Sequence, residues 1–110
     1  MDFRHEHVED LADRVVRREV SARELVQAAL DRIDATNGVI NAFVAVDAER
    51  ALADADELDA RVVAGDDVGP LAGIPLAVKD TEDAIGFRTT QGSALFADSP
   101  VATTGSVLVE

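Results

Sequence analysis

The sequence predicts an α/β fold in which a layer of helices lies against the edge of a β-sheet. Apolar residues recur at the spacing of amphipathic helices over most of residues 6–64. Residues 39–46 and 76–79 form short apolar runs that have the length of strands. We therefore expect the helical layer over about residues 6–64, and the second strand with its loop over about residues 69–103.

Local end signals delimit the first two helices. The first is expected over roughly residues 6–18, where apolar side chains share one face and charged ones the other. Ser21 and Glu24 have the spacing of a capping box, so a second helix is expected to begin after Ser21. Asn37-Gly38 offers the left-handed residue at which many helices end.

Extended and helical segments alternate after this point. Residues 39–46 are expected to form a short strand, and Asp47 to cap a third helix that residues 65–67 end. Pro75 begins the next strand, where a missing amide donor does little harm. After a long irregular stretch, Thr103 or Thr104 is expected to cap a helix that starts about one turn before the last residue. We therefore expect the domain to be incomplete.

The charge balance excludes several classes of partner. Twenty-two acidic residues against ten basic ones give a net charge of -12, which repels nucleic acid and anionic membrane surfaces. Nine of the ten cationic side chains are arginine. Since salt screens the self-repulsion of such an acidic chain, we infer a protein adapted to high salt. No apolar run is long enough to span a bilayer, so a cytoplasmic location is expected.

Most residue types that hold metals or cofactors, or act as nucleophiles, are absent or badly placed. The chain has no cysteine, and His5 and His7 lie near a terminus at a spacing unsuited to a helical metal pair. The glycines of residues 69–73 lack the Gly-Lys-Ser/Thr ending of a phosphate loop. Ser93 and Ser106 lack a Gly-x-Ser-x-Gly context. We expect no metal and no cofactor.

Lys79 is the one candidate for chemistry, because it is the only lysine and ends an apolar run. Periodicity alone favours an ordinary lysine that protects a strand edge. The functional alternative is a desolvated lysine that serves as a general base, with Ile74, Leu76 and Val78 supplying the apolar surroundings. If the strand persists, Asp80 points away from Lys79 and is not its ion-pair partner.

The segment around Lys79 resembles the amidase signature family. Members of this family share a Gly-Pro-Leu-x-Gly-Ile-Pro-x-x-x-Lys-Asp segment, which residues 69–80 match without gaps. Residues 20–26 are similar to the early helix of the family, residues 40–44 to the extended segment after it, and residues 89–93 to its hydroxyl- and glycine-rich turn. The resemblance covers about residues 8–110.

The resemblance implies an α/β fold with helices on both faces of a central mixed sheet, of which residues 1–110 are the N-terminal portion. It also implies hydrolysis of small-molecule amides to a carboxylate and ammonia or an amine. In the family a serine nucleophile, a second serine after a cis peptide bond and a lysine act together, and the lysine corresponds to Lys79. Both serines lie in a later segment that this chain lacks, so the 110 residues alone are expected to be inactive and to need the missing C-terminal part as a partner.

Two alternatives to an amidase that acts alone remain open. The amidase subunit of a tRNA-dependent amidotransferase shares the lysine segment, but more often has a Cys-Ala-Ser-like sequence after the paired threonines. Residues 91–93 are Gln-Gly-Ser here and favour the stand-alone enzyme. Thr81 also replaces the asparagine of many members. A non-catalytic fragment or acidic interaction module is the second alternative, and a homodimer is left open.

Overall fold

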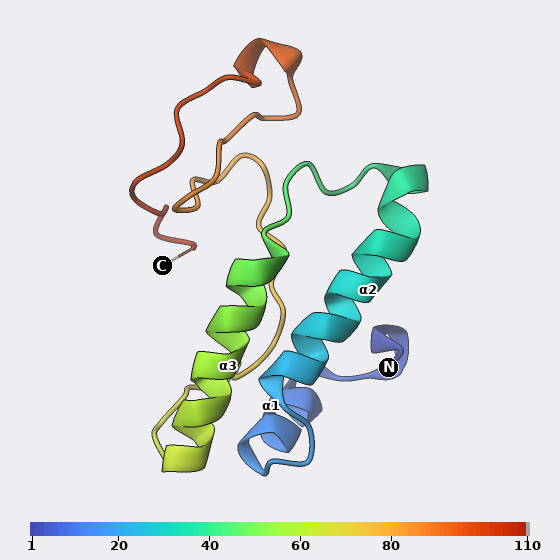
Figure 1. The fold of residues 1–110 in the computed structure, drawn as a ribbon, viewed down its shortest axis with the longest axis vertical. Coiled ribbons are helices and arrows are strands. Elements are labelled where there is room, and N and C mark those ends of the chain that lie inside the picture. The colour runs from blue at the N-terminus through green and yellow to red at the C-terminus, as the bar shows by residue number, and fades with distance from the viewer. Residues whose placement is uncertain (110) are drawn as a thin grey trace. The chain divides into compact units, whose positions relative to one another are not determined.

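The computed structural model describes residues 1–109 and is built from helices and irregular segments (Figure 1). Its elements are η1 (Phe3–His5), α1 (Val8–Val16), α2 (Ala22–Ile40), α3 (Ala48–Ala64) and η2 (Ala94–Phe96), where η marks a 3₁₀ helix. The chain divides into two compact units, Met1–Pro75 and Leu76–Glu110. All three α-helices belong to the first unit, and no helix in the described residues is long and apolar enough to cross a membrane.

The first turn of α2 is held by two sets of side chains. The predicted capping box is confirmed: the Ser21 hydroxyl accepts from the Glu24 amide at 3.0 Å, and the Glu24 carboxylate accepts from the Ser21 amide at 2.8 Å. Asp59 of α3 accepts from the next two amides, Ala22 at 2.7 Å and Arg23 at 3.1 Å. Because helix N-termini leave their first amides without intrahelical partners, Asp59 satisfies these donors and joins α3 to the start of α2.

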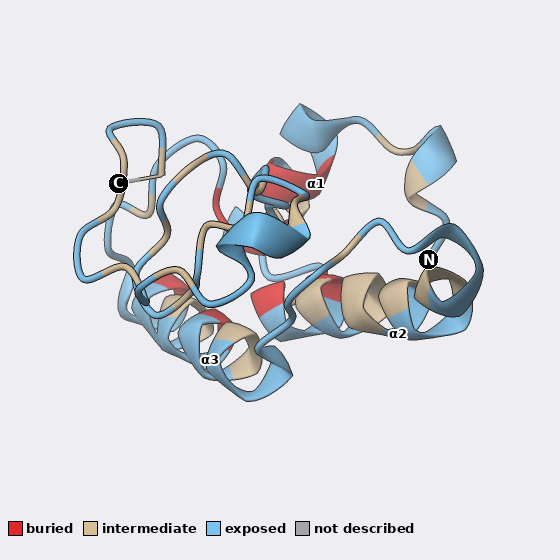
Figure 2. Ribbon diagram, turned by 90° about the horizontal axis from the view of Figure 1, so that it is seen from above, coloured by how far each residue is buried: buried red, intermediate tan, exposed pale blue. Residues whose placement is uncertain are grey.

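The hydrophobic core of the first unit lies where the three helices meet the loop after α3. Leu25 and Val15 are its largest fully buried side chains. Further members of the cluster come from α1, the α1–α2 connection, α2, α3 and that loop: Leu11, Val20, Ala22, Ala55, Val62 and Ala72. Burial fades along α2, whose residues are buried near its start and exposed at its end (Figure 2).

The predicted end of α2 is wrong by one turn. The helix continues through Gly38 to Ile40, and Asn41 takes the left-handed conformation, with its amide donating to the Asn37 carbonyl at 2.8 Å. The side chain of Asn37 bonds instead to both backbone groups of Phe43, at 2.9 and 3.0 Å. Asn37 is thereby used to hold the chain after the helix, and Asn41 supplies the stop.

The two predicted strands do not form in the described residues. Val39 and Ile40 belong to α2, and the rest of residues 39–46 is irregular because the Asn37 amide takes the place of a neighbouring strand at Phe43. Leu76–Lys79 also joins no ladder. The one β-pairing within residues 1–109 is an isolated antiparallel bridge between Arg88 and Val101, so the expected mixed sheet is not present in this part of the chain.

The other element boundaries agree in part with the sequence. Asp47 caps α3 by accepting from the Arg50 amide at 3.1 Å, and Gly65 ends it in the left-handed conformation, as predicted. The first helix is shorter than residues 6–18, since Glu6 closes η1 and Arg18 is left-handed. Residues 107–109 form a turn, and the rest of the helix expected there falls on Glu110, outside the described residues.

Candidate active site

The first half of the lysine segment, Gly69–Pro75, packs as a loop on the helices of the first unit. Ala72 in this loop is buried. Gly73 has a φ of +74°, and a Cβ built on it would lie 3.0 Å from Val15 Cγ2 and 3.2 Å from Ala22 Cα. Glycine is thus required at this position both by its left-handed backbone and by the close approach of α1 and α2. The sequence pattern Gly-Ile-Pro therefore has a packing explanation.

Lys79 belongs to the second unit and is exposed. Leu76 and Val78, which were expected to desolvate its amine, are exposed as well. No carboxylate of residues 1–109 forms an ion pair with Lys79. The Lys79 carbonyl accepts from the Glu82 amide at 3.0 Å, which places the lysine at the start of a turn. The described residues thus hold its backbone and leave its amine free.

Asp80, the next residue, is tied to a turn ten residues further on. Its carboxylate accepts from the Thr90 amide at 2.7 Å, from the Thr90 hydroxyl and from the Gly92 amide at 3.3 Å. Its backbone carbonyl accepts from the Gln91 amide at 2.9 Å. These hydrogen bonds, above all that from the Thr90 hydroxyl, lower the pKa of the Asp80 carboxyl below its ordinary value.

The turn that receives Asp80 has an uncommon backbone. Gln91 and Gly92 both have positive φ angles, +54° and +66°, and the Ser93 amide donates to the Thr90 carbonyl at 3.0 Å. Two left-handed central residues are typical of a type I′ turn, which a non-glycine residue such as Gln91 adopts at a cost. The bonds to Asp80 offset this cost.

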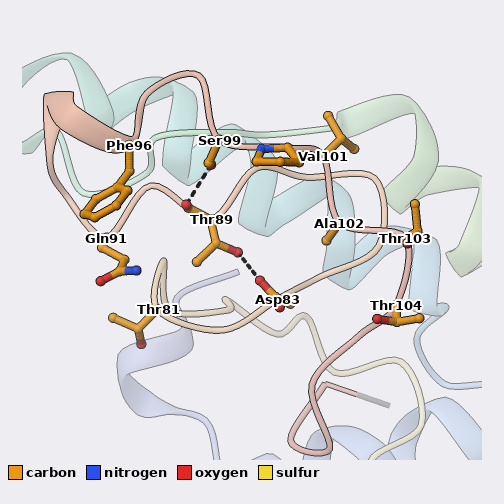
Figure 3. Close-up of a pocket in the computed structure, with 11 residues that line it drawn as sticks. Thr81, Asp83, Thr89, Gln91, Phe96, Ser99, Val101, Ala102, Thr103 and Thr104 are labelled. Atoms are coloured by element: carbon orange, nitrogen blue, oxygen red, sulfur yellow. Dashed lines mark hydrogen bonds between the residues drawn. The ribbon is translucent and has the colours of Figure 1, made fainter.

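A hollow of about 560 Å³ lies in the second unit beside this turn (Figure 3). Hydroxyl and small apolar side chains line most of it, with the ring of Phe96 at one side. Thr89 is one of the lining residues: its hydroxyl donates to the Asp83 carboxylate at 2.6 Å, and its carbonyl accepts from the Ser99 hydroxyl at 2.8 Å. Neither Lys79 nor Asp80 lines this hollow, so it does not enclose the candidate lysine.

The remaining polar candidates have local structural roles or no ligand-binding geometry. The Ser93 hydroxyl accepts from the Leu95 amide at 3.2 Å and so caps η2. The Ser106 hydroxyl is buried without a hydrogen-bond partner among residues 1–109, while its amide donates to the Asp83 carbonyl at 2.9 Å. No group of three or more histidine and carboxylate side chains in the described part of the chain is arranged to hold a metal ion.

A family model matches the part of the chain that contains Lys79. The family model described as Amidase matches residues 24–110, which is most of the chain. The chain belongs to the Amidase family. Residues 69–80, and with them Lys79 and Asp80, lie within the matched range.

Curated members of the Amidase family that resemble this chain are named as amidotransferase subunits. One subunit of the glutamyl-tRNA(Gln) amidotransferase of Acidothermus cellulolyticus is 49% identical over 86 residues, covering 78% of this chain and 17% of the relative. The corresponding subunit from Salinispora arenicola is 50% identical over 88 residues, covering 80% of this chain and 18% of the relative. The chain therefore spans less than a fifth of the length of these relatives.

A solved structure has the same fold over nearly the whole chain. It was reported as "An unexpected vestigial protein complex reveals the evolutionary origins of an s-triazine catabolic enzyme", and superposes with a TM-score of 0.88 at 38% identity. The match covers 94% of this chain and 22% of that one. The fold of this chain is thus shared with part of a chain in that complex.

Sequence reasoning did not foresee the hydrogen-bonded partners of Asp80. The similarity of residues 89–93 to a family turn, and the place of Asp80 in the family segment beside Lys79, predict no contact between the two. A signal was present, since Gln-Gly is a pair of residues suited to a turn and Thr90 precedes it. That signal does not say which carboxylate the turn amides will bind.

Proposed function

We propose that this chain is the N-terminal portion of an enzyme that hydrolyses a carboxylic amide, with Lys79 as its general base and acid. The observation that carries the proposal is the ungapped Gly-Pro-Leu-x-Gly-Ile-Pro-x-x-x-Lys-Asp segment inside the matched range of the Amidase family. Lys79 is the only lysine of the chain. The serine nucleophile and the second serine of the serine–cis-serine–lysine mechanism would come from residues beyond Glu110.

The exposure of Lys79 agrees with an active site in which a later segment supplies the serines. A lysine acts as a base at neutral pH when neighbouring groups desolvate it and lower its pKa. Its amine is free of ion pairs in the described residues, so a later segment can cover it without first breaking a salt bridge. In the proposed reaction, the neutral amine takes the proton of the nucleophile through the second serine and later returns a proton to the leaving amine.

The test is amide hydrolysis by a protein that continues past Glu110, assayed with short-chain carboxamides and with glutamine. Lys79→Ala is expected to lower kcat by about 10²- to 10⁴-fold, which is the usual contribution of a general base. Lys79→Arg is expected to be equally damaging, since an arginine keeps the charge but does not deprotonate.

Arg17→Ala is the matched control for the loss of one cation, because Arg17 is exposed and its side chain pairs with Asp13 in the last turns of the preceding helix α1, at 3.7 Å. Its activity is expected to stay at the level of the unmodified enzyme. Full activity of Lys79→Ala would refute the assignment of the base. The 110 residues by themselves are expected to show no turnover.

A second candidate function is that of an amidotransferase subunit, favoured by the names of the curated relatives. The Gln-Gly-Ser sequence of residues 91–93 favours the enzyme that acts alone. The two are separated by measuring amide hydrolysis with and without added partner subunits and tRNA. Turnover by the isolated enzyme supports the first candidate, and turnover only in the complex supports the second.

A further inference from the structure

Hydrogen bonds to the Lys79 carbonyl and to both the backbone and the side chain of Asp80 hold the residues that follow Lys79. The Lys79 carbonyl closes a turn with the Glu82 amide, and the Asp80 carboxylate and carbonyl together accept four hydrogen bonds from Thr90, Gln91 and Gly92. All these residues belong to the same compact unit. The backbone on the carboxyl side of Lys79 is therefore fixed from across the loop.

The chemistry of a base makes the direction of these bonds informative. A carboxylate paired with a lysine stabilises the ammonium form and raises the pKa of the amine, which opposes its action as a base. The acceptor sites of Asp80 are instead occupied by two amides and a hydroxyl, and Lys79 forms no ion pair in the described part of the chain. The carboxylate next to Lys79 is thus hydrogen-bonded to the turn of residues 90–93.

We infer that Asp80 is the positioning residue of Lys79: it anchors the backbone beside the lysine to the turn of residues 90–93 and does not act as the counterion of the amine. This inference rests on the proposed function, since it concerns the geometry of the same base. The left-handed Gln91 agrees with it, because a strained residue persists where surrounding bonds fix it. Thr90 and Gly92 are the partners that Asp80 needs.

The variants Asp80→Ala, Asp80→Asn and Asp80→Glu separate anchoring from charge. Alanine removes every side-chain acceptor, asparagine keeps one acceptor oxygen without the charge, and glutamate keeps the charge at a longer reach. Asp83→Asn is the matched control, since it removes one carboxylate of the same unit. Among the described residues, the Asp83 carboxylate accepts one hydrogen bond, from the Thr89 hydroxyl. Each variant is measured in the enzyme that continues past Glu110, and Lys79→Ala is measured beside them.

The first readout is amide hydrogen exchange at Thr90 and Gly92. Asp80→Ala is expected to accelerate exchange at both by about tenfold or more, because a broken anchor frees the turn to open. Asp83→Asn is expected to leave both rates within about twofold of the unmodified enzyme. Unchanged exchange in Asp80→Ala would overturn the anchor itself, whatever the activity of the variant.

The second readout is the steady-state kinetics over a range of pH. Asp80→Ala and Asp80→Asn are expected to lower kcat by about 10- to 100-fold with KM within about threefold, since a small displacement of a catalytic group has this effect. The apparent pKa of the limb that reports the base is expected to stay within about half a unit. A counterion would give a different result, because its removal lowers the pKa of the lysine by about one unit or more.

Asp80→Glu tests whether loss of the anchor and loss of kcat occur together. Loss of protection at Thr90 and Gly92 together with loss of kcat supports the inference, whereas loss of protection with full kcat overturns it. If Asp80→Ala fails to fold, Thr90→Val removes one donor from the other side and is expected to lower kcat in the same direction. In the Asp80→Asn background Thr90→Val is expected to have a smaller effect than alone, since both act on one bond.

Failure of this inference is distinct from failure of the proposed function. An inactive Lys79→Ala enzyme with a fully active Asp80→Ala enzyme overturns the positioning role and leaves the base in place. A fully active Lys79→Ala enzyme overturns the base, and the positioning role falls with it.

Discussion

Replacement of Gly73 by alanine tests whether the loop of Gly69–Pro75 is held by close packing against the helices of the first unit. Gly73 has a φ of +74°, and its missing Cβ would lie 3.0 Å from Val15 Cγ2, 3.1 Å from Ala22 Cβ and 3.2 Å from Ala22 Cα. Val15 is 1% exposed and Ala22 0% exposed, so neither has free space into which to move. Ala22 Cα is also backbone in the first turn of α2, which Ser21 and Asp59 hold.

The size of the effect follows from two contributions. A left-handed conformation costs an alanine roughly 1–2 kcal/mol, of which about 0.4–1 kcal/mol is offset by the lower entropy of its unfolded chain. Insertion of a methyl group into a packed site costs a further 1–3 kcal/mol, roughly. We expect Gly73→Ala to lower the free energy of unfolding by about 2–4 kcal/mol.

Gly69→Ala is the control, because Gly69 has a similar φ of +77° but no atom within 4 Å of its missing Cβ. It is expected to lower the free energy of unfolding by only about 1 kcal/mol. Urea unfolding of the chain, followed by circular dichroism of the helices, measures both variants, with an unchanged slope against urea as the check on the comparison. Equal stability of the two variants would refute the argument, since the close contacts of Gly73 would then have no energetic consequence.

Two further changes test how α2 begins. Asp59→Ala is expected to lower the free energy of unfolding by about 1–3 kcal/mol because it leaves the Ala22 and Arg23 amides without acceptors. Asp56→Ala breaks an exposed ion pair with Arg23 and should cost less than about 1 kcal/mol in the same urea titration. A larger loss for Asp56→Ala than for Asp59→Ala would contradict the capping role of Asp59. Hydrogen bonding to Ser21, first to its amide and second to its hydroxyl, lowers the pKa of the Glu24 carboxyl in the folded chain. The stability that the ionised Glu24 contributes is therefore fully present above the pKa of the unfolded chain, and it is lost as pH falls through the pKa of the folded chain. Glu24→Gln is therefore expected to be less stable than the unmodified chain near neutral pH and to lose that difference on acidification below about pH 4. Glu57→Gln, on the exposed face of α3, controls for the loss of one charge, and a difference in Glu24→Gln that persists at low pH would exclude this linkage.

The helices were predictable because their signals are local. Ser21 and Glu24 lie three residues apart, and Asp47 binds an amide within the first turn of its own helix, so both caps are made by residues that are close together in the sequence. The strands were not predictable in this way, because an apolar run becomes a strand only when a neighbour supplies hydrogen bonds. For Phe43 that neighbour is the side chain of Asn37, and Leu76–Lys79 joins no ladder within residues 1–109.

The candidate site likewise has a part that the sequence predicts and a part that only the fold reveals. The spacing of glycines and prolines before Lys79 identified the family segment from sequence alone, because this pattern is contiguous. Its contacts depend on residues far along the chain: Gly73 lies against Val15 and Ala22, and Asp80 binds Thr90 and Gly92. Sequence periodicity does not encode such pairs.

The sequence by itself thus determined the family, the candidate base and the start of each long helix, since all three depend on residues close together in the chain. The tertiary structure decided where α2 ends, that α3 caps its beginning, and that Asp80 serves a distant turn and not its neighbouring lysine. The physical reason is that a carboxylate binds the amides that the fold brings to it. Its place in the sequence fixes only which amides lie nearby before folding.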